Sequence, residues 1–106
     1  MFDDDSARLR RQQRFLSEVE MAIRDANRRI IHERIPDLDR QRFVTFATFV
    51  ARLRADYLAE ALATESAPDQ VQAVESLRLR RRAFAEARDA VAALERAVER
   101  GYVDIG

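Results

Sequence analysis

Hydrophobic side chains recur with the period of an α-helix in three segments of the chain, at about residues 6–34, 38–63 and 68–100. Two short stretches interrupt this periodicity, and each contains one of the two prolines, Pro36 and Pro68. Proline removes a backbone hydrogen-bond donor and disfavours helix in the residue before it. The sequence therefore predicts three long helices in one domain, residues 1–106, which ends in a short tail after residue 100.

The first segment carries a seam of apolar residues with heptad spacing. Its members are Leu9, Leu16, Ile23 and Ile30, with Gln12, Val19 and Ala26 at the alternate positions. Apolar residues at this spacing favour slight left-handed coiling of a helix against a neighbour. We therefore expect a coiled-coil-like contact along the first helix.

The second segment is apolar over a wider arc than a helix with one buried face needs. At 100° per residue, its two adjacent apolar stripes cover more than half of the circumference. We expect this helix to lie between the other two and to keep apolar surface for another chain. Phe49 and Leu62 are the residues that we assign to that surface.

The third segment has a row of small residues, Ala83, Ala90 and Ala97, that would let another helix backbone come close. Connections of three to five residues make neighbouring helices antiparallel. The sequence thus predicts an all-α, elongated antiparallel three-helix bundle with coiled-coil-like seams. Either one chain closes this bundle, or a helical hairpin and a third helix are completed by a second subunit in a dimer.

Four residues are expected to mark the helix ends. Asp37 or Asp39 fits the N-cap of the second helix, because an aspartate oxygen accepts from the free backbone N–H groups there. Ser66 and Asp69 match the S-x-x-D capping pattern for the third helix. Gly101 is suited to end that helix, because glycine adopts the left-handed conformation that follows many helices.

Composition excludes several classes of partner and location. The 19 basic side chains, all arginine, balance 19 acidic ones, so we expect no strongly anionic partner such as duplex DNA or a membrane surface. No apolar run approaches the ~20 residues that span a bilayer. The start of the chain is acidic at Asp3, Asp4 and Asp5, where a secretory signal peptide would be basic. We therefore expect a cytoplasmic protein.

Candidate catalytic or metal chemistry is sparse. Cysteine is absent, and both glycines lie in the last six residues, so the chain contains no thiolate nucleophile and no glycine-rich phosphate loop. The single histidine is His32. Three and four residues before it, where a helix would place further metal ligands on the same face, the chain has Arg29 and Arg28. We therefore expect no catalytic residue, no cofactor and no metal.

Arginine is concentrated in one part of the third helix. Arg78, Arg80, Arg81 and Arg82 lie close together, and Arg88 follows two turns after Arg81. These side chains can cover the edge of the core and reach nearby carboxylates, or they can form a docking patch for an acidic partner or an anion.

Arg54 is a separate candidate, because its helical angle places it between the two apolar stripes of the second helix. A charge in that position needs a partner or a route to the rim. Together with Arg80 or Arg81 it could line a small anion pocket.

These observations predict a non-catalytic helical protein–protein interaction module, such as an adaptor, assembly factor or small chaperone-like protein. We expect it to associate with itself as a homodimer, or to bind a protein partner. The alternative is an anion or nucleic-acid binder that uses the Arg78–Arg82 cluster. A small helical enzyme with an Arg54-lined pocket is the third hypothesis.

Overall fold

The computed structural model describes residues 2–106, with side chains from Asp4 onward. It contains three helices, α1 (Phe2–Arg34), α2 (Arg40–Thr64) and α3 (Gln70–Glu99), and no strand among the described residues. The molecule spans 76 × 39 × 16 Å. The all-α class and the elongated three-helix architecture are therefore confirmed.

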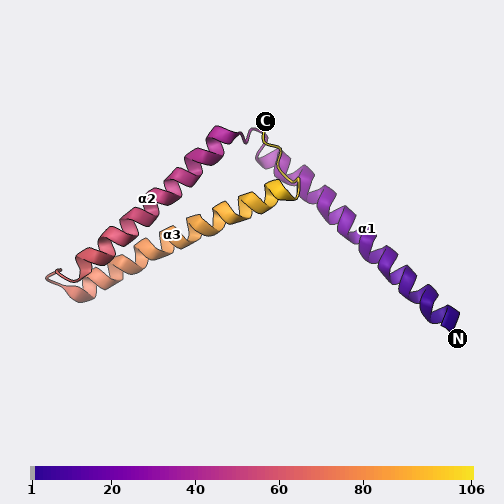
Figure 1. The fold of residues 1–106 in the computed structure, drawn as a ribbon, viewed down its shortest axis with the longest axis horizontal. Coiled ribbons are helices and arrows are strands. Elements are labelled where there is room, and N and C mark those ends of the chain that lie inside the picture. The colour runs from indigo at the N-terminus through magenta and orange to yellow at the C-terminus, as the bar shows by residue number, and fades with distance from the viewer. Residues whose placement is uncertain (1) are drawn as a thin grey trace.

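Packing between helices is confined to α2 and α3, which form an antiparallel hairpin. α1 joins the open end of this hairpin and leads away from it (Figure 1). The expectation that α2 lies between the other two helices is wrong, because α2 packs along α3 alone. The wide apolar arc of α2 is therefore only partly covered within the chain.

Aspartate side chains begin two of the helices. Asp39 is the N-cap of α2, where its Oδ1 accepts from the backbone N–H of Arg42 at 2.7 Å. Asp69 caps α3 in the same way through Gln72, at 3.1 Å. The expected capping role of Ser66 is wrong, because its hydroxyl donates to a carbonyl of the preceding helix instead. The third helix consequently begins at residue 70 and not near residue 68.

A glycine ends α3 as expected. Gly101 has a φ of 73°, which side chains other than glycine rarely adopt. The Tyr102 N–H donates to the Ala97 carbonyl at 2.8 Å, and the Gly101 N–H donates to the Val98 carbonyl at 3.0 Å. These two bonds form a Schellman motif, which satisfies the last carbonyls of the helix and turns the tail back toward α1.

The hairpin meets α1 at a small packed junction. Three large apolar side chains are buried in the described chain: Val50 on α2, Leu38 in the connection before it, and Val103 in the tail. Arg28, near the end of α1, donates through Nε to the Gly101 carbonyl at 3.0 Å. Two of the three buried residues therefore belong to the segments that link the hairpin to α1.

The chain exposes far more surface than a compact protein of its size. Its accessible surface is 8899 Å², whereas a folded monomer of 12.3 kDa exposes about 6,100 Å². The radius of gyration is 22.5 Å, against about 13 Å for a compact domain of this length. The single chain thus leaves about 2,800 Å² of surface beyond the usual amount in contact with solvent.

Candidate interaction surfaces

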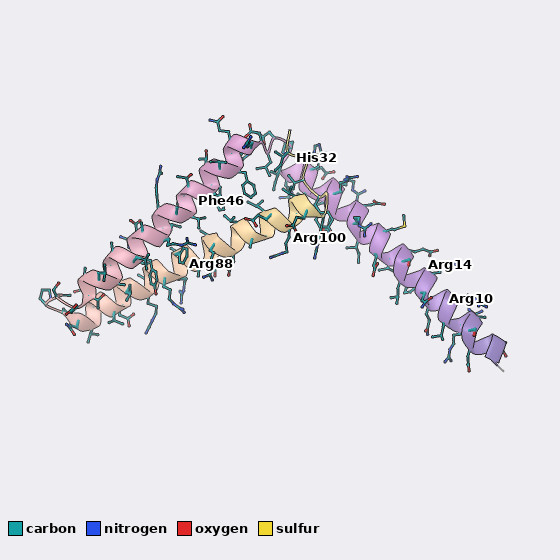
Figure 2. All side chains as sticks on the ribbon, in the orientation of Figure 1. Arg10, Arg14, His32, Phe46, Arg88 and Arg100 are labelled. Carbon is teal, nitrogen blue, oxygen red and sulfur yellow. The ribbon has the colours of Figure 1, made fainter. Side chains whose placement is uncertain are left out.

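The large side chains of the heptad seam of α1 are all exposed, and only Ala26 of the seam is half-buried. Every side chain from residue 8 to residue 25 is exposed, including the seam residue Leu16 at 58%. Figure 2 shows Arg10 and Arg14 on the part of α1 that projects from the hairpin. Near the junction, the seam residue Ile23 lines a hollow with Arg100 and Tyr102. This end of the seam therefore faces the angle between α1 and the hairpin.

The five residues assigned from sequence to an oligomer interface lie on the hairpin and are mostly exposed. Leu62 is the most exposed of the large apolar residues, at 81%, and Phe49 is exposed at 45%. Ala83 and Ala90 are exposed, and Ala97 is half-buried.

These five residues do not form one surface. Phe49 and Leu62 point roughly 140° apart around the axis of α2, since they are thirteen residues apart along it. Phe49 instead lies against Phe46 of its own helix, with ring centroids 5.9 Å apart. Ala83, Ala90 and Ala97 share one side of α3. This side is roughly opposite to Ala92, which lines a depression between α2 and α3.

One side of the hairpin is hollowed between its two helices. Two open depressions lie there. One is lined by Ala47, Val50, Ala51, Arg54, Arg88, Val91, Ala92 and Glu95, and the other by Tyr57, Val74, Leu77, Arg78, Arg81, Arg82, Ala85 and Glu86. We call this side, defined by these residues, the hollowed face. Three alanines line the first depression, so it lacks large side chains there, whereas the second has only Ala85 among larger residues.

The arginine cluster of α3 divides between paired and unpaired side chains. Arg80 is paired across the hairpin, with Nε 2.8 Å from Glu60 Oε2 and a terminal nitrogen 3.9 Å from Asp56. Arg78 pairs with Glu75 of its own helix at 3.4 Å. In the part of the chain that the structure describes, no carboxylate lies within ion-pair distance of Arg81 or Arg82.

Glu60 on α2 has a pKa that is lowered from its ordinary value. The Ser76 hydroxyl donates to Glu60 Oε1, and this bond is the main reason that the pKa of Glu60 is lowered. Desolvation raises the pKa in part, and the adjacent Arg80 guanidinium lowers it further. The Glu60 carboxylate is therefore fixed as an anion that holds Ser76 and Arg80 on one edge of the hairpin.

Arg54 contacts an aromatic ring, that of Phe84, which the sequence analysis did not predict as its partner. Its guanidinium lies 5.1 Å from the centroid of the Phe84 ring, and that of Arg88 lies 5.4 Å from the same centroid. Tyr57 stacks on Phe84 at 6.2 Å. Cation–π contacts of this kind stabilise an arginine at the edge of a core. Arg54 lines its depression with Arg88 and Glu95, and not with Arg80 or Arg81.

His32, the remaining candidate from the sequence, has no set of metal ligands around it among the described residues. His32 is exposed near the end of α1, and Figure 2 shows it at the apex where α1 meets the connection to α2. No group of three or more possible metal ligands occurs among the described residues. Across residues 2–106, none of the helices combines the length and the apolar character that crossing a membrane requires.

Comparison of the chain with known protein families, with curated proteins and with solved structures finds no match.

Sequence reasoning missed two features of these surfaces. It identified the seam of α1 but expected a neighbour there, and it did not single out Phe84 as the ring that holds Arg54 and Arg88. Phe84 could have been found from its place on the α3 seam, since residue 88 is one turn further along the helix. The exposure of α1 had no such signal, because a heptad pattern does not say which chain provides the partner.

Proposed function

We propose that this chain is a non-catalytic helical protein–protein interaction module that associates with itself, in the manner of an adaptor, assembly factor or small chaperone-like protein. The observation that supports this is the excess of about 2,800 Å² of exposed surface. Permanent interfaces bury about 2,000–5,000 Å² in total, so the excess is as large as such an interface. A homodimer is the simplest closed assembly that would cover it.

The composition of the exposed surface also supports a partner. Fifteen large apolar side chains are exposed in the described chain, on all three helices and in the tail. Single exposed apolar residues are ordinary, but contiguous apolar patches of several hundred Å² mark interaction sites. The seam of α1 carries a leucine or isoleucine every second turn, with Val19 and Ala26 between them, and only Gln12 interrupts this apolar stripe. We place the protein in the cytoplasm as part of the same proposal.

Molar mass in solution tests the proposal directly. Light scattering coupled to gel filtration should give about 25 kDa, twice the chain mass of 12.3 kDa, at high protein concentration. Ile23→Asp on the seam should shift the mass toward that of one chain. Met21→Asp is the matched control, because Met21 is equally exposed on the far side of α1. A mass of one chain at every concentration would remove the proposal.

A second function is favoured by one observation, the absence of a carboxylate partner near Arg81 and Arg82 among the described residues. These side chains line one depression together with Arg78, so the depression can accept an anion. Binding of a polyanion should then weaken with salt and weaken further in Arg81→Glu/Arg82→Glu. Arg10→Glu/Arg14→Glu changes the charge equally, on α1. Equal loss in the two variants would point to unspecific charge attraction and end this alternative.

A further inference from the structure

We propose that α1 of one copy packs on the hollowed face of a second copy's hairpin, running antiparallel to the α3 of that copy. This inference rests on the proposed self-association and specifies its interface. Three observations carry it: the direction that the short connections allow, the distribution of charge along α1 and α3, and the match of shape between the seam and the hollowed face.

The direction in which α1 runs relative to α3 distinguishes packing within one chain from packing on a second copy. The connection between α1 and α2 covers only residues 35–39. If α1 closed onto its own hairpin, it would run antiparallel to α2 and therefore parallel to α3. A helix from a second copy carries no such constraint. Only the second copy can present α1 antiparallel to α3.

Charge opposes closure within one chain. Along α1, the basic residues Arg8, Arg10, Arg11 and Arg14 lie about 30–40 Å before its C-terminal end, and the Arg78–Arg82 cluster lies about 30 Å before the end of α3. Parallel packing would therefore bring two basic segments to nearly the same level. It would also set Glu20 beside Glu86. Like charges brought together at an interface are destabilising.

The antiparallel direction pairs unlike charges instead. With Arg8 placed opposite Glu95 of the second copy, Glu20 falls opposite residue 83, next to Arg82, and Arg11 falls near residue 92, between Asp89 and Glu95. Arg8 and Arg11 line a hollow on α1 with the seam residue Leu16, and Glu20 lines another with the seam residue Ile23. There are two exceptions: Arg24 falls near Arg78 and Arg80, and Glu18 falls near Glu86.

Shape and length agree with this arrangement. α1 has 33 residues and α3 has 30, so at ~1.5 Å per residue both are about 45–50 Å long. The leucine and isoleucine side chains of the seam are exposed on α1, and the depression lined by Ala47, Ala51 and Ala92 has room for them. The exchange is reciprocal, since each copy gives one α1 and receives one, and it forms a closed dimer.

Cysteine cross-linking between two different variants tests the direction, because the chain has no cysteine of its own. Chains with Gln12→Cys are mixed with chains carrying Ala92→Cys, and the mixture is treated with oxidant or with a short bis-maleimide. The control mixture pairs Gln12→Cys with Arg78→Cys, the position that parallel packing would place opposite Gln12. Positions 78 and 92 are about 21 Å apart along α3, so a short link distinguishes them. We expect the first mixture to give at least tenfold more heterodimer.

The outcomes separate this inference from the proposed function. A monomeric chain at all concentrations would end both. A dimer that links position 12 preferentially to position 78, or to neither position, would overturn the antiparallel arrangement while self-association stands. Charge exchange provides a second measurement. Glu20→Arg should weaken the dimer by up to about tenfold, and mixing it with Arg82→Glu should restore association. No recovery in the mixture would likewise count against the arrangement.

Discussion

Replacement of Leu16 by alanine should affect the association of two copies but not the stability of a single copy. Leu16 is a seam residue in the middle of α1 and is 58% exposed. Its truncation removes no buried contact within one copy, since its neighbours along α1 are exposed as well. Alanine also has the highest helix propensity, so α1 itself should not be weakened. A monomeric protein should therefore tolerate Leu16→Ala without loss of stability.

An assembly held by the seam should respond very differently. Burying a leucine side chain contributes about 1.5–3 kcal/mol relative to leaving it exposed. A symmetric dimer loses this contribution twice, so its dissociation free energy should fall by about 3–6 kcal/mol. Since 1.4 kcal/mol corresponds to a tenfold change in an equilibrium constant, the dissociation constant should rise roughly 10²- to 10⁴-fold. Sedimentation equilibrium measures this constant directly.

Met21→Ala is the matched control for this experiment. Met21 is 61% exposed and has a side chain of similar size, but it lies on the opposite side of α1 from the seam. Its truncation should leave the dissociation constant within about threefold of the original value. If Leu16→Ala and Met21→Ala had the same effect on association, the seam would not be the contact and the reasoning from its exposure would fail.

Three further substitutions test local features of the fold. Gly101→Ala should lower stability by about 1–2 kcal/mol in a thermal melt, because its φ of 73° is strained for alanine, and Gly106→Ala should be neutral because it has open space around it. Asp39→Ala should cost about 0.5–2 kcal/mol by removing the N-cap of α2, and an unchanged melting temperature would show that α2 begins elsewhere. Glu60, with its lowered pKa, contributes stability that is present above the ordinary glutamate pKa of about 4.3 and is lost as pH falls through the lowered value. Glu60→Gln should therefore reduce the decline in stability on acidification, and Glu33→Gln serves as its control in urea unfolding at several pH values.

The elements of this fold are local consequences of its sequence, which is why periodicity predicted them. The N-cap by Asp39 and the end of α3 at Gly101 each need only a few neighbouring residues. The S-x-x-D pattern failed at Ser66 because Asp69 is the residue that accepts from the Gln72 amide at the start of α3, while the Ser66 hydroxyl donates to the Ala63 carbonyl. Short-range hydrogen bonding therefore decided these boundaries in every case.

The arrangement of the helices depends on terms that periodicity does not contain. A heptad seam predicts that α1 has an apolar face, and the wide arc of α2 predicts more apolar area than one neighbour covers. Neither pattern says that the segments around Leu38 and Val103 pack into a junction from which α1 leads away. For the same reason, the arginines at 54 and 88 were visible in the sequence, but their common position over Phe84 was not.

The state of α1 should itself depend on association. Helices without tertiary contacts are at best marginal in water, because most helical stability in proteins comes from packing of an apolar face. All side chains from residue 8 to residue 25 are exposed in one copy, so packing contributes nothing to that stretch of α1 there. Its backbone amides should therefore exchange rapidly with solvent when the protein is dilute, and slowly at concentrations where the molar mass doubles.

The amides of α2 and α3 are the internal control, since these helices pack on each other within one chain. If protection of residues 8–25 stayed constant while the molar mass changed with concentration, α1 would be stable without a partner. The link between its exposed seam and assembly would then be lost.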